Sequence, residues 1–544
     1  MNDESITPRY SPGQVAKTPP CQAGCLNCGD IRGWIQLVAQ RRKMGLSREQ
    51  AFERAWRRIA EVNPFPATLG RICPHPCEST CNRGSKDEPL AINAMERFLG
   101  DYAIETCLSF EREQGPARRQ SLAVIGAGPA GLSFAYQMAR RGYPVNVYES
   151  REQAGGMLRY GVPDYRLPPE VLDAEIRRIL ELGVTLETGV AIGRDISLDT
   201  LRQRHDAVFL GIGAQQGRGL SIPGAEGPGV QTATAFLERM NSGEAVHLGE
   251  HVIVVGGGNS AMDAARSARR TGATVHLLYR RSLAEMPATP EEVELAAEEG
   301  VELLLLSTPT RIEHGDDGRL RRVEVTRVVL GELDSSGRRR PEPVEGSEYW
   351  LEADSVILAT SQLPDRAGFE ALFGDGRWLV AGERGGLVDG LLAGGDALGL
   401  GMAGNAIVQG RHAAEQLHAR FSGNEDLPAE NLVSTVDPDQ IKTESRDAGT
   451  AARPDRIGAA ERLRDPLAET ERTLDAERFL SEVERCFSCG SCFGCEQCSM
   501  YCTSGCYTRL SEVGPGAYFS LTLDACQACG KCIEVCPCGF LEVV

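Results

Sequence analysis

Two runs of cysteine near the carboxyl end constrain this chain more than any other feature. Four cysteines follow the spacing C-x2-C-x2-C-x3-C, and four more repeat it: Cys492, Cys495, Cys498 and Cys502, then Cys526, Cys529, Cys532 and Cys536. Pro537 follows the second run, whereas Thr503 follows the first, where proline is usual. Protein thiolates at this spacing bind two 4Fe–4S clusters. The segment is therefore expected to fold around its cofactors.

In paired runs of this kind, three close cysteines of one run share a cluster with the fourth cysteine of the other. We therefore expect one cluster on Cys492, Cys495, Cys498 and Cys536, and one on Cys526, Cys529, Cys532 and Cys502. The alternative is two structural zinc sites, which need only paired C-x2-C motifs. The spacing leaves four further thiols without a role, so an extra or rearranged cluster stays open: Cys486, Cys489, Cys506 and Cys538.

Composition sets limits on location and partners. The chain has 544 residues, enough for several buried cores. No apolar run approaches the roughly 20 residues that cross a membrane, and Met1 to Tyr10 lacks the apolar core of a signal peptide. Nineteen cysteines, clustered at metal-ligand spacing, predict a reducing cytoplasmic location. The formal net charge of −18 argues against nucleic acid as a partner.

A first glycine-rich turn lies between an expected strand and an expected helix. Ser121 to Ile125 has the pattern of a buried strand, a helical stretch runs to about Arg141, and the strand Val145 to Tyr148 ends at Glu149. The turn has the G-x-G-x-x-G fingerprint of dinucleotide binding, and Glu149 stands where an acid would hold ribose hydroxyls. The alternative is a glycine turn of structural use alone. The turn residues are Gly126, Gly128, Pro129, Ala130 and Gly131.

A second turn predicts a different nucleotide. The expected strand His251–Val255 leads into a G-x-G-x-x-A variant, with candidate binding residues Gly256, Gly258, Asn259, Ser260 and Ala261. The next expected strand is Ala273 to Leu278. Just beyond it, Arg280 and Arg281 stand near the position that Glu149 has relative to the first turn. An acid would repel a 2′-phosphate, whereas arginines would bind it. We therefore expect NADP(H) here; the alternative is a solvated basic corner.

Two nucleotide sites in one chain suggest a flavoprotein that exchanges hydride with a nicotinamide. Residues 392–396 have the pattern of a strand ending in glycines and an acid, followed by a helix that contains Gly410 to Ala414. We expect Gly395 and Asp396 to face the ribityl or pyrophosphate region of the flavin. The chain would then return to the first nucleotide domain after the second has been inserted.

Together these motifs resemble the small-subunit family of NADPH-dependent glutamate synthase, which is also the flavin half of dihydropyrimidine dehydrogenase. The matching stretches cover roughly residues 20 to 420: Asn63–Pro66, Gly70–Glu78, Gly155–Met157, Tyr160–Pro163, Tyr165–Pro168, Gly256–Asn259, Tyr279–Arg281, Met286–Ala288 and Gly394–Asp396. The resemblance implies FAD in the first site, with Gly156 among its binding residues, and NADPH in the second. The cysteine-rich tail resembles the ferredoxin-like domain found on a subset of this family.

The resemblance also implies iron–sulfur clusters in the N-terminal region. Four residues match the ligands of one cluster: Cys25, Cys73, Cys77 and Glu96. Cys21 and Cys81 match ligands of a second, but the upstream C-x2-C that usually completes it is missing. Leu26 replaces a usual proline, and the added Cys28 could substitute as a ligand. We therefore expect one cluster in this region, and leave a second open.

Local patterns give further expectations. Ser47–Gln50 is a capping box that should begin a helix ended by Asn63-Pro64. Residues 424–470 are charged and have few aromatics, which favours a linker or a wrapping segment. Residues 465–485 have the pattern of an amphipathic helix. Cys107 stands alone and is expected to be a buried, inert thiol.

The predicted fold is multidomain. It has a helical N-terminal iron–sulfur domain, two Rossmann-like α/β nucleotide-binding domains and a C-terminal α+β domain like a bacterial ferredoxin. The predicted boundaries are 1–118 for the helical cluster domain, 119–235 with 366–424 for the FAD domain, 236–365 for the NAD(P)H domain, 425–480 for the linker and 481–544 for the ferredoxin-like domain.

The predicted function is electron transfer between NAD(P)H, FAD and 4Fe–4S clusters, with flavin converting between hydride and single electrons. We name no acid–base catalytic residue. The expected partner is ferredoxin or subunits like those of a 2-oxoacid:ferredoxin oxidoreductase, within a larger complex. Residues 481–544 carry seven acidic and three basic side chains, so that partner should present a basic face. Two alternatives are the small subunit of NADPH-dependent glutamate synthase and a cluster-binding relay that does not oxidise nicotinamide.

Overall fold

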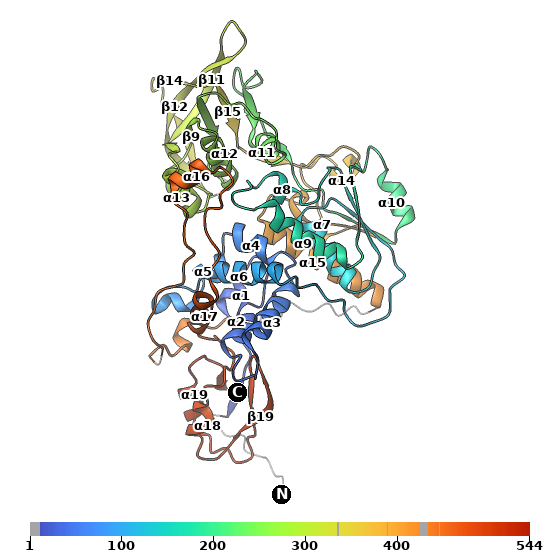
Figure 1. The fold of residues 1–544 in the computed structure, drawn as a ribbon, viewed down its shortest axis with the longest axis vertical. Coiled ribbons are helices and arrows are strands. Elements are labelled where there is room, and N and C mark those ends of the chain that lie inside the picture. Colours follow the sequence, from blue (N-terminus) through green and yellow to red (C-terminus); the bar gives the residue numbers. More distant parts are fainter. Residues whose placement is uncertain (1–10, 335–336, 389, 424–433, 445) are drawn as a thin grey trace. The chain divides into compact units, whose positions relative to one another are not determined.

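The computed structural model describes residues 11–544 except 335–336, 389, 424–433 and 445 (Figure 1). The chain divides into two units, each assembled from separate segments. The first comprises Met1–Glu111, Glu415–Asp455 and Thr473–Val544, and the second comprises Arg112–Ala414 and Arg456–Arg472. Both expected nucleotide-binding domains lie in the second unit, except for the part of the FAD domain after Ala414, and both cysteine-rich regions lie in the first.

A six-stranded sheet in the second unit carries the first glycine turn. Its order is β17-β18-β5-β2-β3-β4, and all neighbours are parallel except β17 and β18. Parallel strands end at one edge of a sheet, so the loops after β2, β3 and β18 meet there. The strands are β2 (Leu122–Ile125), β3 (Val145–Glu149), β4 (Thr185–Thr188), β5 (Ala207–Leu210), β17 (Gly386–Val388) and β18 (Leu391–Ala393).

Helices α7 (Pro129–Arg140) and α15 (Ala403–Ser422) meet beside this sheet. Ser133 of α7 donates a hydrogen bond to the carbonyl oxygen of Ile407 at 2.7 Å. Phe134 stacks on Phe209 of β5, with ring centroids 4.5 Å apart. The hydrogen bond holds α15, which follows β18 in the chain, against α7, the helix that begins at the first glycine turn. The ring contact holds α7 against β5. Further helices of this part are α8 (Met157–Tyr160), α9 (Pro169–Glu181), α10 (Leu198–Arg204) and α14 (Glu370–Phe373).

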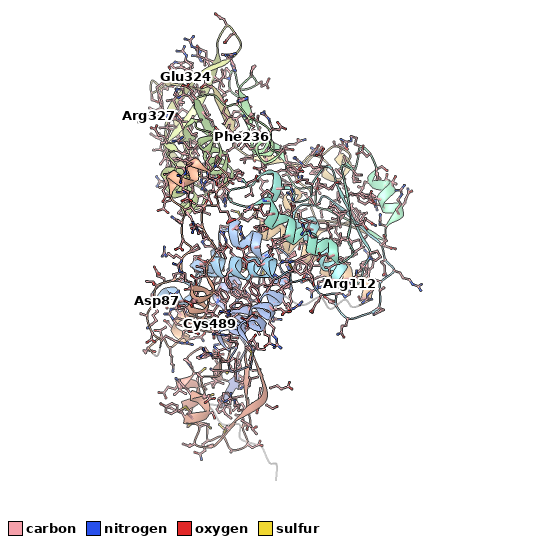
Figure 2. The ribbon with its side chains drawn as sticks, in the orientation of Figure 1. Asp87, Arg112, Phe236, Glu324, Arg327 and Cys489 are labelled. Carbon is pink, nitrogen blue, oxygen red and sulfur yellow. The ribbon has the colours of Figure 1, made fainter. Side chains whose placement is uncertain are left out.

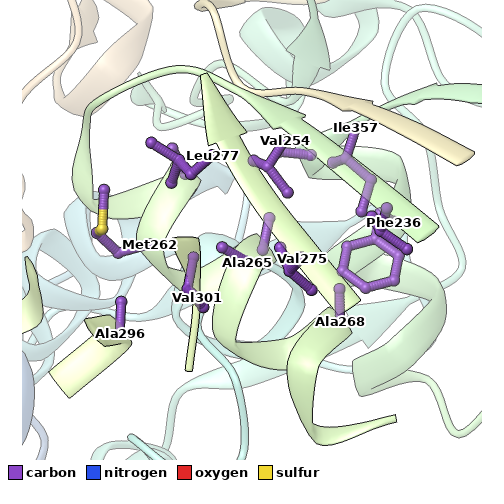
Figure 3. Close-up of a cluster of buried hydrophobic side chains, with 14 of the residues drawn as sticks. Phe236, Val254, Met262, Ala265, Ala268, Val275, Leu277, Ala296, Val301 and Ile357 are labelled. Atoms are coloured by element: carbon purple, nitrogen blue, oxygen red, sulfur yellow. The ribbon is translucent and has the colours of Figure 1, made fainter. Parts of the chain in front are cut away.

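A five-stranded parallel sheet carries the second glycine turn, in the order β10-β9-β8-β15-β7. Helix α12 (Asn259–Arg270) packs on it through alanines, and Figure 3 shows Ala265 and Ala268 facing Val254, Val275 and Leu277. Small side chains allow the helix to approach the sheet closely. The strands are β7 (Val230–Thr232), β8 (His251–Val255), β9 (Thr274–Tyr279), β10 (Glu302–Leu305) and β15 (Ser355–Leu358).

An antiparallel sheet and two helices complete this nucleotide-binding part. The sheet contains β11 (Ser307–His314), β12 (Leu320–Leu333), β13 (Arg339–Pro343) and β14 (Tyr349–Glu352). The helices are α11 (Ala233–Asn241) and α13 (Pro290–Glu298).

The first unit contains a helical core. Gly70 and Gly100 allow α4 and α6 to touch, because a Cβ at Gly70 would lie 2.4 Å from the Cα of Arg97 and one at Gly100 would lie 2.3 Å from the nitrogen of Ala67. The predicted capping box at Ser47 is present and begins α3. The helices are α1 (Pro20–Ala23), α2 (Ile31–Ala39), α3 (Arg48–Ala60), α4 (Pro66–Ile72), α5 (Pro76–Ser79), α6 (Ile92–Glu105) and α17 (Ala476–Glu484).

The cysteine-rich tail forms a small α+β arrangement in the same unit. Strands β19 (Tyr507–Gly514) and β20 (Ala517–Leu521) form a hairpin, and short helices α18 (Gln497–Tyr501) and α19 (Lys531–Val535) carry cysteines. The last strand, β21 (Leu541–Val543), pairs antiparallel with β1 (Pro12–Gln14).

Two local predictions are wrong. The expected helix over 465–485 is confined to α17, because the Asp475 side chain caps that helix by accepting hydrogen bonds from the backbone N–H groups of Glu477 and Arg478. Cys107 is exposed rather than buried, since it lies just past the end of α6 with a φ of +53°. Among the described residues, no helix is long and apolar enough to cross a membrane.

Within the second unit, residues 456–472 lie against α12 and α13 through a buried ionic network. The Glu299 carboxylate, wholly buried, accepts hydrogen bonds from Arg266 at 2.9 Å and from Arg462 at 3.0 Å. Arg270 also pairs with it, at 3.0 Å. Figure 1 shows the orange helix α16 (Ala459–Arg464), which carries Arg462, beside α13. The Glu299 carboxylate thus joins residues 456–472 to the NAD(P)H-binding part.

Replacing Glu299 by alanine should destabilise this part strongly. Three arginines would lose a buried counter-charge, a change that costs about 3–5 kcal/mol when one partner of a buried pair is removed. Amide hydrogen exchange in β8 and α12 measures that free energy. Arg194→Ala, which removes an exposed ion pair with Asp195 in the same unit, is the control and should leave exchange nearly unchanged. Equal protection in the two variants would contradict the role of Glu299.

Candidate functional site

The first glycine turn has the geometry expected for a bound pyrophosphate. Gly126 has a φ of +96°, and a Cβ there would lie 2.4 Å from the carbonyl oxygen of Gly211. A Cβ on Gly131 would lie 2.0 Å from the carbonyl oxygen of Gly126, so this glycine lets α7 pack on β2. Gly128 precedes α7, and a Cβ there would meet only the Cα of Gly156, at 3.8 Å. The space over Gly128 is therefore bounded by backbone and open to a ligand.

Two other predicted residues, Glu149 and Gly156, lie around this turn. Glu149 is buried at the end of β3, and its Oε2 accepts a hydrogen bond from the backbone N–H of Ala127 at 2.7 Å. The carboxylate is thereby fixed against the turn. Gly156 has a φ of +55°, and a Cβ there would lie 2.8 Å from the Cα of Gly128, so the two glycines form one backbone cradle.

Asp396 and Gly395 reach the same place from the end of β18. A Cβ on Gly395 would lie 3.0 Å from the Cβ of Ala130 in the first turn of α7. Asp396 accepts a hydrogen bond from the backbone N–H of Gly401 at 3.0 Å, and burial raises the pKa of this carboxyl to about 6. Residues nearly 270 positions apart, such as Gly128 and Asp396, therefore belong to one edge of the sheet.

The second glycine turn has the same plan with different side chains. A Cβ on Gly256 would lie 2.4 Å from the carbonyl oxygen of Ala359, whereas one on Gly258, just before α12, would have no described atom within 4 Å. Ala261 is buried where the first turn has Gly131. Asn259 Oδ1 accepts a hydrogen bond from the backbone N–H of Thr289 at 3.0 Å, which ties the turn to the start of α13.

The two arginines after β9 differ in their surroundings. Arg280 is exposed. The Arg281 side chain is buried, pairs with Asp334 at 2.7 Å and donates to the carbonyl oxygen of Arg339 at 2.7 Å. Both residues thus follow β9, with Arg281 bound to the neighbouring hairpin and Arg280 exposed.

The C-terminal cysteines gather into two groups that mix the two runs. A space of about 400 Å³ is lined by three cysteines of the first run and the last of the second: Cys492, Cys495, Cys498 and Cys536. A space of about 370 Å³ is lined by three of the second run and the last of the first: Cys526, Cys529, Cys532 and Cys502. The groups are the two ligand sets expected from the spacing. Each group offers four thiols, which is the donor set of a 4Fe–4S cluster.

Two unassigned thiols stand beside these groups. Cys538 lies 3.8 Å from Cys536 between sulfur atoms. Its hydrogen bond, with those of nearby backbone N–H groups, lowers the pKa of Cys536 to about 6, against the effect of burial. Cys506 donates its backbone N–H to the sulfur of Cys502 at 3.3 Å. Cys538 and Cys506 therefore each form a hydrogen bond with the sulfur of a predicted cluster ligand. The spacing of the cysteines alone does not reveal these contacts.

In the helical core, the predicted ligands of the first N-terminal cluster are neighbours. Burial raises the pKa of Cys73 to about 12, and the charge of Glu96 adds to the shift. Burial likewise raises the pKa values of Cys25 and Cys77, each with a contribution from Glu96. Asn63 donates a hydrogen bond to Glu96 at 2.8 Å. Three thiols and one carboxylate are thus close enough to act on one another electrostatically, as the ligands of one cluster site would be.

Cys21 and Cys81 also lie close together, but Cys28 is exposed and lies near Cys25 instead. Their neighbours are Cys486 and Cys489, which the prediction left without a role. In the described residues, no group of three or more histidine, cysteine or acidic side chains converges tightly enough to hold a single metal ion.

Comparison with known proteins agrees with this geometry. A family model described as pyridine nucleotide-disulphide oxidoreductase matches residues 120–410, which contain both glycine turns. The chain belongs to this family. A second model, described as dihydropyrimidine dehydrogenase domain II with a 4Fe–4S cluster, matches residues 14–108 of the oxidoreductase. The predicted Rossmann-like nucleotide-binding fold and N-terminal iron–sulfur domain are confirmed.

Curated relatives support the same assignment. The oxidoreductase is 37% identical to the NADP(+)-dependent formate dehydrogenase subunit beta of Moorella thermoacetica, over 87% of this chain and 70% of that one. It is 34% identical to the glutamate synthase [NADPH] small chain of Azospirillum brasilense, over 79% of this chain and 92% of that one. It is 39% identical to the NADPH-Fe(3+) oxidoreductase subunit beta of Geobacter sulfurreducens, over 64% of this chain, and it spans about half (51%) of that relative. The predicted resemblance and an electron-transfer oxidoreductase function are confirmed.

Gly258→Ala should weaken NADPH binding at least tenfold without loss of stability. The new methyl group meets no described protein atom within 4 Å, so it can affect only what approaches the turn. The dissociation constant, from fluorescence titration, and the thermal midpoint are the measurements. Gly219→Ala, which also has open space around it, is the matched control. Unchanged NADPH affinity in Gly258→Ala would place the dinucleotide elsewhere.

Asp396 should give the FAD-free protein a distinctive pH dependence. Its folded pKa of about 6 exceeds the unfolded value, so its contribution to stability is full below about 4 and is lost as pH rises through 6. Asp396→Asn keeps the side-chain acceptor and removes the titration. From pH 7 to pH 4, the wild type should gain up to about 3 kcal/mol relative to that variant in urea unfolding. A constant difference across this range would show that the carboxyl titrates normally.

Proposed function

We propose that this chain is the NADPH-linked electron-transfer subunit of a larger redox complex. The observation that carries the proposal is the pairing of two glycine turns of opposite character within one unit. One turn ends at the acid Glu149, and the other is followed by Arg280 and Arg281. An acid suits a free ribose, and arginines suit a 2′-phosphate. FAD at the first turn and NADPH at the second account for both.

The chain's own groups supply binding and orientation. At the first turn, the N-terminus of α7 and the backbone of Gly128 and Gly156 would hold the FAD pyrophosphate, with Asp396 beside the flavin end. At the second turn, Gly258 and the N-terminus of α12 would hold the NADPH pyrophosphate. When bound, flavin exchanges electrons in pairs with nicotinamide and singly with iron–sulfur clusters.

The cysteine groups of the first unit would hold the one-electron carriers. The proposed sites are Cys25, Cys73, Cys77 and Glu96 in the helical core, with the two mixed C-terminal groups in a ferredoxin-like domain. We also propose the domain boundaries that the sequence predicts. The Moorella, Geobacter and Azospirillum relatives are named as subunits or a small chain. A partner subunit is therefore part of the proposal, with ferredoxin or a 2-oxoacid:ferredoxin oxidoreductase as candidate classes and the cytoplasm as the site of action.

The small subunit of a glutamate synthase is the second candidate, since one relative of that name is matched over 92% of its length. The same match covers 79% of this chain. The two additional cysteine groups near the C-terminus favour the first candidate, because they offer a further route for single electrons.

Anaerobic titration with NADPH tests the proposal as a whole. NADPH should bleach the flavin absorbance of the purified protein and bring up the low-temperature EPR signals of reduced clusters. If NADPH fails to bleach a bound flavin, the chain does not oxidise nicotinamide by itself, and the cluster-binding relay becomes the better description.

Arg280→Ala should raise the KM for NADPH roughly 10–100-fold and leave NADH oxidation unchanged. The estimate follows from the loss of a charged hydrogen bond, worth about 1.5–3 kcal/mol. Steady-state kinetics with an artificial acceptor measures both nucleotides. Arg319→Ala removes another exposed arginine of the second unit and is the control. An equal loss with NADH and NADPH would mean that Arg280 does not read the 2′-phosphate.

A further inference from the structure

Four partly buried cysteines from three parts of the sequence meet in the first unit. Cys21 lies on α1, Cys81 follows α5, and Cys486 and Cys489 follow α17. Burial and the neighbouring thiols Cys486, Cys81 and Cys489 raise the pKa of Cys21. Burial likewise raises the pKa of Cys489 to about 12, with contributions from Cys486 and Cys81. The thiols of Cys81 and Cys486 thus act on both Cys21 and Cys489, and Cys489 acts on Cys21, so the four cysteines are neighbours.

Hydrogen bonds beside the cysteines hold the three segments together. Thr80, next to Cys81, donates to the carbonyl oxygen of Pro20, next to Cys21, at 3.0 Å. Asn82 donates its side-chain N–H to the sulfur of Cys489, at 3.6 Å. Arg83 donates to the carbonyl oxygen of Arg485, at 3.0 Å. Each of these hydrogen bonds involves residues at or within two positions of one of the cysteines. The fold itself therefore brings the cysteines together.

Helix α17 fixes the position of Cys486 and Cys489. Its Phe479 is fully buried and packs against Phe98 and Phe52, with ring centroids 4.2 and 5.2 Å apart. Its Glu482 accepts hydrogen bonds from the backbone N–H of Ala91 at 2.9 Å and of Ala452 at 2.7 Å. In Figure 1 the red α17 lies among the blue helices of this unit.

A buried ion pair holds the end of the same helix. Arg485, which precedes Cys486, pairs with Asp87 at 3.0 Å. Arg83 also pairs with Asp87, at 2.5 Å. Figure 2 labels Asp87 and Cys489 in this part of the chain. The loop that carries Cys486 and Cys489 is therefore anchored on the side of Cys81.

The loop from Cys486 to Gly490 shares two positive-φ positions with the loops that begin the two C-terminal cysteine runs. In the Cys486 loop and in the first C-x2-C of each C-terminal run, the second residue after the first cysteine has a positive φ: +58° at Ser488, +67° at Gly494 and +51° at Ala528. In each, the residue after the second cysteine does too: +67° at Gly490, +68° at Glu496 and +70° at Gly530. Positive φ is costly for Ser488, Glu496 and Ala528, so its recurrence indicates a shared functional requirement.

The repeated loop also directs the same donor at sulfur. Ser488 donates its backbone N–H to the sulfur of Cys486 at 3.4 Å, and Ala528 donates its own to the sulfur of Cys526 at 3.4 Å. Hydrogen bonds of this kind stabilise thiolates and tune the potentials of clusters. Arg32, whose charge opposes the pKa rise at Cys21, donates to the carbonyl oxygen of Cys489 at 2.6 Å. Inert core thiols would need none of these features.

We propose that Cys21, Cys81, Cys486 and Cys489 bind a further 4Fe–4S cluster. The C-x2-C that the N-terminal region lacks is supplied by the segment after α17. A single zinc ion fits less well, since no group of three such side chains in the described residues converges on one ion. The proposal rests on the proposed function in one respect, that the chain carries iron–sulfur clusters. It adds a site and its ligands.

The test is metal content in a full-length variant. Cys486→Ser with Cys489→Ser, purified anaerobically and reconstituted, should lose about four iron and four sulfide per chain relative to the wild type. Its FAD content should not change. Cys28→Ser with Cys107→Ser removes two exposed thiols of the same unit and should lose none. Retention of the full iron content by the Cys486/Cys489 variant would overturn the proposal.

Two measurements cover a variant that folds poorly. Native mass spectrometry of the wild type should show four 4Fe–4S clusters; three clusters, or stoichiometric zinc, would overturn the proposal. Cys21→Ser alone, which leaves the loop after α17 intact, should lose the same EPR signal as the double variant. NADPH bleaching of FAD, measured on the same samples, separates the two proposals, because its failure with four clusters present would contradict only the proposed function.

Discussion

The stacking of Phe479 on Phe98 is the contact on which the first unit depends. It places a helix from the end of the chain into a core made by the beginning, and Glu482 adds buried hydrogen bonds to backbone at Ala91 and Ala452. Burying a phenylalanine side chain contributes about 1.5–3 kcal/mol, and aromatic pairing adds to it. This packing also positions Cys486 and Cys489, which follow α17. Both lie within four residues of Arg485, whose buried side chain pairs with Asp87.

The two nucleotide-binding sheets show how one backbone plan carries two specificities. In both sheets, a buried strand leads through a glycine turn to the N-terminus of a helix. The glycines lack a Cβ, and the space that this atom would fill is one that a phosphate could enter. The difference lies after the neighbouring strand, where Glu149 is fixed by the N–H of Ala127 in one and Arg281 is fixed by Asp334 in the other. The Glu149 carboxylate is fixed against its turn and the Arg281 guanidinium against a hairpin, whereas Arg280 is exposed.

Local sequence patterns predicted much of this structure. The strand at His251–Val255 has the predicted bounds, and the capping box at Ser47 begins α3, because hydrophobic runs and caps act over a few residues. The mixed grouping of C-terminal cysteines was also expected from spacing. The long helix over 465–485 was not found, since the Asp475 cap outweighs the amphipathic pattern before it. The neighbours of Cys21 could not be predicted, because docking of α17 depends on packing between residues that are hundreds of positions apart.

The order in which the segments occur along the chain has a consequence for biosynthesis. A ribosome completes the helices of residues 20–105 first, then the whole of residues 112–414, and only afterwards the segment that carries Phe479 and Cys486. Domains generally fold as they emerge. The early helices must therefore wait, with Phe52 and Phe98 uncovered and Cys21 lacking Cys486 and Cys489, until nearly the entire polypeptide has been translated. The cluster proposed at Cys21 would therefore be assembled late in maturation, and the uncovered aromatic side chains would be prone to aggregation until then.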